Sequence, residues 1–440
     1  MAQFTGICKT SEPQPSEIRS TCPQGSSEGV IRLKNSPIQI GNLILAAISV
    51  IGPAYAIAFS VLCAMHLILF NSTGHPIAFD FAEFWSAGEL ALSGNVLAAY
   101  DPRLIHAAEV ATVGHPFTNF IGWFYPPWFF FVAAGLACLP PAWAFVLWIN
   151  TTLLFCSATV AAIARRWDAA LLAMAAPWAM LCTVEGQTGL LTAAIIGGVL
   201  LTLEHRPRLS GILLGLLTYK PHFGLLFPLV LVFSGYWRTF FWAFATAIMI
   251  ALASGAAFGF GTFPAFVHAL SGAAQVHLVT KPPSAWPALQ SVYALARARH
   301  LPYGTSIVLQ SILSATAMIS VVYVWRTQID YALKATALAA AVPLVTPYVW
   351  AYDMPLLSVT LAYFYRNKPF DRVEWWSIVL AAVAAASAIH YPGGLVANLI
   401  VAILAVRRIR MDLATPKTLM SRDDAGSRCN SVNLSAAASA

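Results

Sequence analysis

The sequence predicts an all-α protein that crosses a membrane many times. Hydrophobic residues make up 59% of the 440 positions, and the mean hydropathy is +0.70. A soluble core cannot hide that much apolar surface, so many side chains must face lipid. We expect one membrane domain of about 11 to 13 transmembrane helices over residues 41–406. The polar tails at 1–40 and 407–440 are expected to be disordered and cytoplasmic.

The apolar runs that predict these helices have roughly the 20 residues needed to cross the hydrocarbon layer. They lie at 44–70, 141–164, 168–184, 187–203, 209–234, 238–260, 304–325, 332–347, 351–366, 374–389 and 393–406. Several runs are short and are broken by proline or polar residues. Irregular backbone at membrane depth is tolerated where water or protein satisfies it, so we expect helices that stop below the surface around a recessed site.

Lysine and arginine indicate the cytoplasmic ends of the helices, because short basic loops are retained on that side. The basic stretches lie at Arg32 and Lys34, 164–167, 204–208, 235–238, 325–334, 365–372 and 407–410. Two larger loops, 71–124 and 261–303, then fall on the extracytoplasmic side. In the first loop, FAEFWSAGELALSG and DPRLIHAAEVATVG predict short amphipathic helices on the outer surface, each with Asp at its start and Gly at its end. The aromatic residues of 261–303 indicate a folded lid.

The parity of the spans leaves two arrangements open. In the first, 209–234 crosses twice with Lys220-Pro221-His222 at its turn, and 125–140 dips in without crossing. In the second, 125–140 crosses and 209–234 is a single span. Both arrangements keep the two large loops extracytoplasmic.

Composition and spacing argue against several classes of function. The net charge of +7 comes from short clusters between apolar runs, which set topology and do not indicate a nucleic-acid partner. The seven cysteines have no CxxC spacing, and no histidine pair has HExxH spacing, so neither a disulfide framework nor a metal is expected. Phosphate-loop motifs are absent, and no cofactor is expected. No apolar segment begins near Met1, so we expect no cleavable signal peptide.

Asp80 is the first candidate for chemistry. It comes about ten residues after Phe70, where the apolar run ends, so the chain is expected to lie near the membrane surface at this point. With Glu83 and Glu89, it concentrates carboxylates in a chain that is only 10% charged. An Asp before a helix is also a common N-cap, and the two glutamates also fit solvated surface positions.

Lys220 in LLTYKPHFGLLFPL is flanked on both sides by apolar sequence, which is costly unless the lysine faces a cavity or an anion. The following proline breaks the helix, and His222 adds a second potential donor. A phosphate is the natural partner of such a pair. A lysine that snorkels near a helix end is the alternative.

Other polar groups interrupt apolar runs at Glu185-Gly186-Gln187 and at Tyr352-Asp353. Polar residues at membrane depth mark functional sites by default. Alternatively, these polar residues form hydrogen bonds between neighbouring helices and have a structural role.

Six short motifs follow one another in a recognisable order. They are DFAEFWSAGELALSGNVLAAYD at 80–101, YPPW at 125–128, GQTGLL around Gln187, GLLTYKP at 215–221, LQSVYALAR at 289–297 and TPYVW at 346–350. This series resembles glycosyltransferase family 87, a family of polytopic GT-C enzymes that take sugars from polyprenyl phosphates and include phosphatidylinositol mannoside mannosyltransferases.

The resemblance implies a GT-C-like helix bundle and a role for each motif. Asp80 would be the catalytic base, because the family's base is the Asp of the first extracytoplasmic loop. Lys220 and His222 would bind the donor phosphate. The remaining candidates, for sugar or acceptor binding, are Glu83, Tyr125, Gln187, Gln290, Trp350, Tyr352 and Asp353.

The sequence departs from the family pattern at two places. Family members often have histidine shortly after the tryptophan of the TPYVW-like motif, where this chain has Tyr352 and Asp353. The Asn often found before Gln-Ser is replaced by Leu289. The first departure puts an assisting imidazole, and the sugar recognised, in doubt.

The function implied is inverting transfer of a hexose, with mannose as one candidate. The sugar would pass from a polyprenyl-phosphate donor to a lipid or glycan acceptor, on the outer side of the plasma (inner) membrane and in contact with its lipids. A polytopic lipid or solute transporter is the alternative, although the paired halves typical of transporters are not visible in the sequence. A noncatalytic assembly partner is a third possibility.

Overall fold

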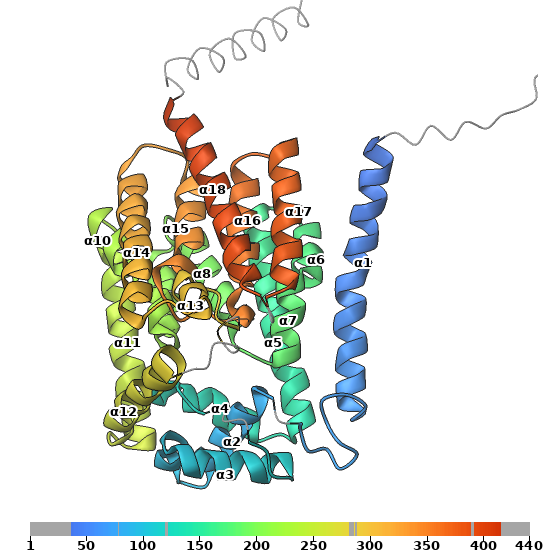
Figure 1. Ribbon diagram of the computed structural model, residues 1–440, viewed down its shortest axis with the longest axis vertical. Coiled ribbons are helices and arrows are strands. Elements are labelled where there is room, and N and C mark those ends of the chain that lie inside the picture. Colours follow the sequence, from blue (N-terminus) through green and yellow to red (C-terminus); the bar gives the residue numbers. More distant parts are fainter. Residues whose placement is uncertain are drawn as a thin grey trace, which may run out of the picture. The chain divides into compact units, whose positions relative to one another are not determined.

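The computed structural model describes residues 37–77, 79–118, 122–280, 286, 288–388 and 391–414 (Figure 1). The chain divides into two units, 1–44 and 45–440. The described part of the first unit, from Pro37, belongs to helix α1 (Pro37–Ala64), which therefore begins inside the tail expected at 1–40. The rest of that tail, and residues 415–440, lie outside the described residues.

Within its described residues, the second unit consists of helices joined by turns and loops, without a β-strand. After α1 its helices are α2 (Phe81–Leu92), α3 (Pro102–Val113), α4 (Phe130–Ala137), α5 (Pro141–Ala164), α6 (Asp168–Ala175), α7 (Pro177–Glu185), α8 (Gly189–Thr202), α9 (Pro207–Leu216), α10 (Leu226–Phe233), α11 (Trp237–Phe258), α12 (Thr262–Ala274), α13 (Val292–Ala298), α14 (Tyr303–Arg326), α15 (Tyr331–Val345), α16 (Leu356–Asn367), α17 (Arg372–Ala386) and α18 (Gly393–Ala414), with short helical turns η2 (Pro127–Phe129), η3 (Leu217–Tyr219), η4 (Pro221–Gly224) and η7 (Ala351–Asp353).

Within the described residues, only some helices are long and apolar enough to cross a membrane. These are α5, α11 and α14, and the pair α6–α7 makes a fourth if its 60° bend is taken as one span. By contrast, α8 has 14 residues and measures about 21 Å, less than the roughly 30 Å of hydrocarbon. Short helices are thus present where the sequence predicts them, and the expected 11 to 13 spans stay a prediction.

Two segments, 209–234 and 125–140, decide on which side of the membrane the later loops lie. Neither of them forms one continuous membrane-length helix. The run 209–234 is not one continuous helix, because α9 ends before η3 and the chain turns at Lys220 before η4 and α10. Pro221 explains the break, since its ring removes a backbone donor. Helix α4, with 8 residues, measures about 12 Å and is too short to cross.

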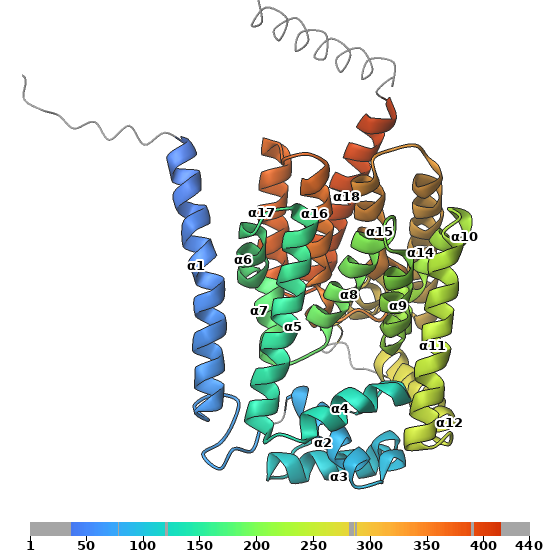
Figure 2. The same ribbon diagram turned by 180° about the vertical axis from the view of Figure 1, so that it is seen from behind.

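The helices α2, α3 and α4 lie together at one end of the second unit, with α12 beside them (Figures 1 and 2). The connections α14–α15 and α16–α17 lie at the opposite end. Aromatic contacts join the first group to the membrane helices. Phe84 of α2 packs at a tilt on Tyr125, and the rings of Tyr125, Phe129 and Tyr219 of η3 stack in turn, with centroid distances of 5.3, 4.7 and 5.1 Å along the series. All four rings are buried, so this group is packed onto the membrane helices.

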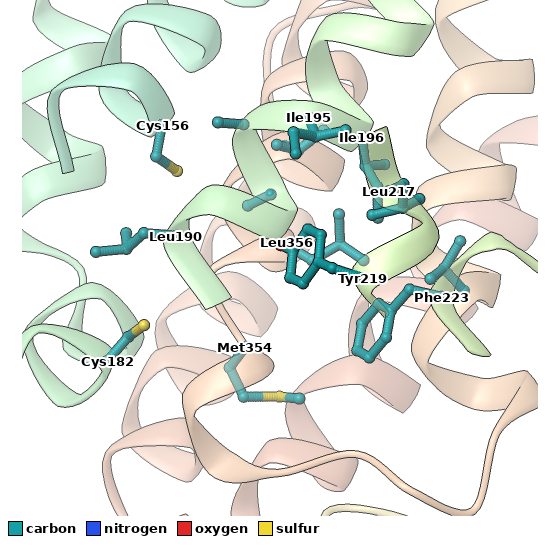
Figure 3. Packing of buried hydrophobic residues seen from close by; sticks show 14 of the residues in the cluster. Cys156, Cys182, Leu190, Ile195, Ile196, Leu217, Tyr219, Phe223, Met354 and Leu356 are labelled. Carbon is teal, nitrogen blue, oxygen red and sulfur yellow. The ribbon is translucent and has the colours of Figure 1, made fainter. Parts of the chain in front are cut away.

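The apolar core lies where the broken helices meet. Figure 3 shows side chains of α8 facing those of η3, η4 and the start of α16. The labelled residues from these elements are Leu190, Ile195, Ile196, Leu217, Tyr219, Phe223 and Leu356. This packing holds the broken helices against one another.

Helix α18 continues from Arg407 to Ala414, where the disordered tail was expected to begin. Arg408 explains the difference. Its guanidinium is buried, donates to Glu374 Oε1 at 2.6 Å, and donates to the carbonyl oxygens of Phe364 and Lys368 at 2.6 and 2.7 Å. These bonds hold the last turns of α18 against the α16–α17 connection.

We predict that Gly189→Ala destabilises the fold. A Cβ atom at Gly189 would lie 1.7 Å from the carbonyl oxygen of Tyr352, so α8 and η7 would have to move apart. The expected loss in free energy of unfolding is about 1–3 kcal/mol, measured from thermal unfolding in detergent. Gly135→Ala in α4 is the control, because its added Cβ would meet nothing within 4 Å. Equal midpoints for the two variants would contradict the close contact.

Candidate functional site

The side chain of Asp80 does not cap the helix that follows it. Asp80 precedes α2 but makes no capping hydrogen bond. Asp101, at the same position before α3, accepts hydrogen bonds from the backbone N–H groups of Arg103 and Leu104 at 2.8 and 3.1 Å. The N-cap interpretation is therefore correct for Asp101 and wrong for Asp80.

The carboxylate of Asp80 is held by Gln187 instead. Gln187 lies in the break between α7 and α8, and its Nε2 donates to Asp80 Oδ2 at 2.9 Å and to Glu83 Oε1 at 3.2 Å. Its Oε1 accepts a hydrogen bond from the Tyr125 hydroxyl at 3.1 Å, which fixes the orientation of the amide. Gln187 therefore joins the loop that carries Asp80 to the membrane helices.

The two carboxyl groups that share Gln187 have different surroundings. Glu83 is only 4% exposed, whereas Asp80 keeps partial exposure. Burial raises the pKa of Asp80, and the Gln187 hydrogen bond and the charge of Lys220 oppose that rise. Burial also raises the pKa of Glu83, well above its usual value, and the nearby charges of Asp80 and Glu109 raise it further. Glu83 thus favours its neutral form more strongly than Asp80 does.

Lys220 is paired with a carboxylate from a distant part of the chain. Its Nζ donates to Asp353 Oδ1 at 2.6 Å, and both side chains are buried. Asp353 Oδ2 accepts from the backbone N–H of Trp350 at 3.0 Å. The ammonium also lies 5.0 Å from the ring centroid of Tyr352 and 5.7 Å from that of Phe223, within cation–π range. Lys220 therefore does not snorkel to a surface.

Asp80 and Lys220 lie in the same region of the structure, close enough for their charges to interact. The charge of Lys220 acts on both Asp80 and Glu83, and the carboxylate of Glu185 acts on Asp80 and Asp353. The partly exposed members of this group are Asp80, Glu185, His222, Trp350 and Tyr352. Ionisable and aromatic side chains with partial exposure thus lie around a buried ion pair, and the expected recessed site stays a prediction.

Trp350, Tyr352 and His222 provide the aromatic surface of this site. Trp350 and Tyr352 stack with an interplanar angle of 13° and a centroid distance of 6.0 Å. The ring of His222 packs edge-on against Tyr348 at 5.8 Å. Within the described residues, neither the imidazole nitrogens of His222 nor the Tyr352 hydroxyl have a hydrogen-bond partner, so they are available to a ligand.

Both polar atoms of the Gln290 side chain form hydrogen bonds with the protein backbone. It is 1% exposed, its Nε2 donates to the carbonyl oxygen of Ala388 at 2.7 Å, and its Oε1 accepts from the Gly394 N–H at 2.8 Å. These bonds tie the segment before α13 to the α17–α18 connection. The sugar-binding role expected for Gln290 stays a prediction.

Sequence reasoning missed Glu109 and its partner His106. Glu109 is fully buried in α3; its Oε1 accepts from the Gly122 N–H at 3.3 Å, and its Oε2 lies 3.4 Å from His106 Nδ1. Burial raises the pKa of Glu109, and His106 and the Gly122 bond oppose that rise. The i, i+3 spacing of His106 and Glu109 on the predicted helix was the available signal.

A separate cavity of about 390 Å³ lies beside α2 and α3. Its lining includes His75, Trp85, Glu89, Ser93 and Thr112, and none of the residues that the resemblance assigns to the site. Among the described residues, no group of three His, Cys, Asp or Glu side chains could hold a metal ion.

The fold and the site define a helical membrane protein in which a loop carboxylate is bound at one break between short helices and a buried cation is paired at another. The model of glycosyltransferase family 87 matches residues 123–347, about half the chain, and the protein belongs to this family. It is therefore a membrane glycosyltransferase, with a sugar donor and an acceptor. The match includes Gln187 and Lys220 but neither Asp80 nor Asp353. No curated protein and no solved structure matches the chain.

We predict that Lys220→Met lowers the free energy of unfolding by about 3–5 kcal/mol, because it leaves Asp353 buried without its partner. The double variant Lys220→Met/Asp353→Leu should recover most of that loss, since both charges are removed together. Thermal unfolding of the purified proteins in detergent measures both effects. A double variant as unstable as the sum of its single variants would show that the two side chains are not coupled.

Proposed function

We propose that the protein transfers a hexose, with mannose as one candidate, from a polyprenyl-phosphate donor to an acceptor hydroxyl. The observation that carries this proposal is the uncapped carboxylate of Asp80, held by Gln187 in the same site as the Lys220 ammonium. Membership of glycosyltransferase family 87 supplies the reaction class.

Asp80 is the proposed general base. Gln187 occupies Oδ2, and among the described residues Oδ1 has no hydrogen-bond donor, so this oxygen can accept a proton from the acceptor hydroxyl. The acceptor oxygen attacks the anomeric carbon on the side opposite the phosphate, and the carbon–phosphate oxygen bond breaks. The configuration inverts, the proton resides on Asp80, and the bonding electrons remain on the departing phosphate. General-base help of this kind typically contributes about 10²–10⁴ in rate.

Lys220 and His222 are the proposed partners of the phosphate. An ammonium in a site with little water stabilises the developing charge of the leaving phosphate most strongly. Tyr352 and Trp350, partly exposed beside Lys220, are proposed to contact the sugar. The lipid tail of the donor would lie against the apolar helices. No metal ion is needed in this scheme.

The distribution of basic residues supports an extracytoplasmic site, and we propose the plasma (inner) membrane as its location. The α14–α15 and α16–α17 connections contain the basic stretches 325–334 and 365–372, and they lie at the end opposite α2, α3 and α4 (Figure 1). Short basic loops are retained in the cytoplasm. Asp80, directly before α2, would then face the outer side.

We predict that Asp80→Asn lowers the transfer rate by about 10²–10⁴ without weakening donor binding, because the amide cannot take the proton. Transfer and binding are measured separately on purified protein reconstituted with candidate polyprenyl-phosphate sugars. Asp101→Asn is the matched control on the same loop, since asparagine keeps the N-cap. Normal transfer by Asp80→Asn would remove Asp80 as the base.

We predict that Gln187→Leu shifts the acidic limb of the pH–rate profile to higher pH. The base works only when it is deprotonated, so activity is lost as the pH falls through the pKa of Asp80. Removing the hydrogen bond that opposes the rise in this pKa raises it further. Gln310→Leu, which removes another buried amide, should leave the limb in place. A limb that does not move in Gln187→Leu would show that Gln187 does not set the ionisation of the base.

A further inference from the structure

We infer that Asp353 is the resident counter-ion of Lys220 and that its recapture of the ammonium promotes release of the polyprenyl phosphate after transfer. This inference rests on the proposed function. It gives Asp353 a role different from sugar binding, namely as a positioning residue that acts through Lys220.

The geometry makes Asp353 the fixed member of the pair. Its Oδ2 is bound to the Trp350 N–H of its own turn at 3.0 Å, while Oδ1 accepts from Lys220 at 2.6 Å. Gly189 brings α8 against the carbonyl of Tyr352, which further restricts η7. Asp353 therefore cannot follow the ammonium if Lys220 turns toward a phosphate.

Lys220 is the mobile member. Its four-carbon side chain starts at the break between η3 and η4, and its ammonium has three donors. Only one donates to Asp353, and the rings of Tyr352 and Phe223 flank the ammonium. A small rotation of the Lys220 side chain can thus bring its ammonium to a phosphate while the ammonium stays next to the rings of Tyr352 and Phe223.

The charge of the phosphate changes during the proposed reaction. In the donor, the phosphate is a diester with one negative charge. After transfer it is a monoester, which carries about −1.5 to −2 near neutral pH because its second pKa is about 6. The fixed carboxylate of Asp353 therefore repels the product more strongly than the donor, and the ammonium returns to Asp353 as the product leaves.

The test compares two lipids that carry no sugar, so it does not depend on sugar identity. Polyprenyl monophosphate stands for the product, and its methyl phosphodiester stands for the charge of the donor. Dissociation constants are measured by a binding assay on wild type, Asp353→Asn and Asp353→Glu. Asparagine keeps an oxygen for the Trp350 N–H, and glutamate keeps the charge.

At pH 8, Asp353→Asn should bind the monophosphate roughly tenfold more tightly than wild type, with a much smaller change for the diester. The gain should shrink by pH 5.5, because the monoester then carries one charge. The other ionisable side chains of the site, Asp80, Glu83, Glu185 and His222, are common to both proteins. Asp353→Glu should resemble wild type, and Asp353→Asn should show stronger product inhibition of transfer.

The outcomes separate this inference from the proposed function. Wild type that binds neither lipid would overturn the polyprenyl-phosphate donor itself. Wild type that binds both lipids, with equal or weaker monophosphate binding by Asp353→Asn, would overturn only the role of Asp353. If Asp353→Asn does not fold, the wild-type protein alone tests the inference. Its preference for the diester over the monoester should then increase between pH 5.5 and pH 8. A preference that stays constant over this range would contradict the inference.

Discussion

The site depends on one constraint, that a charge at the break of a short membrane helix needs an opposite charge in contact with it. Lys220 lies at such a break, and Asp353, 133 positions further along the chain, supplies the carboxylate at 2.6 Å. The pair fixes the η3–η4 turn against η7. Gly189 then lets the start of α8 approach η7, so three helix breaks meet at one place. Polar backbone at these breaks is satisfied by protein, which is why the helices can stop short.

Gln187 extends this arrangement to the loop. Its amide bonds Asp80 and Glu83 on one side and Tyr125 on the other, and the Tyr125 ring belongs to the stack that carries α2. The apolar packing and the polar contacts therefore place the same loop. A carboxylate on a freely moving loop could not be held in this way, and the proposed role of Asp80 as a base needs that fixed position.

Much of the fold was predictable from the sequence because hydrophobic length and proline act locally. The runs at 141–164 and 304–325 correspond to α5 and α14, and the break at Lys220-Pro221 was expected. The contacts of the site were not predictable, because they join positions far apart in the chain. The partnership of Asp80 with Gln187 spans 107 positions. Local rules also left a cap open for Asp80, and they could not distinguish it from Asp101, which does cap its helix.

The balance of charge in the site bears on which carboxyl group can act as a base. Asp353 is the partner of Lys220, so the single ammonium is already compensated before any anionic donor enters. A further buried negative charge is costly, and Glu83, nearly inaccessible and beside two other carboxyl groups, is the one most strongly driven to its neutral form. Asp80 keeps some contact with solvent, and both Gln187 and Lys220 favour its ionised form. Environments that push two neighbouring carboxyl groups apart in pKa typically separate their chemical roles. That difference supports the proposal of Asp80, and not Glu83, as the group that accepts the proton.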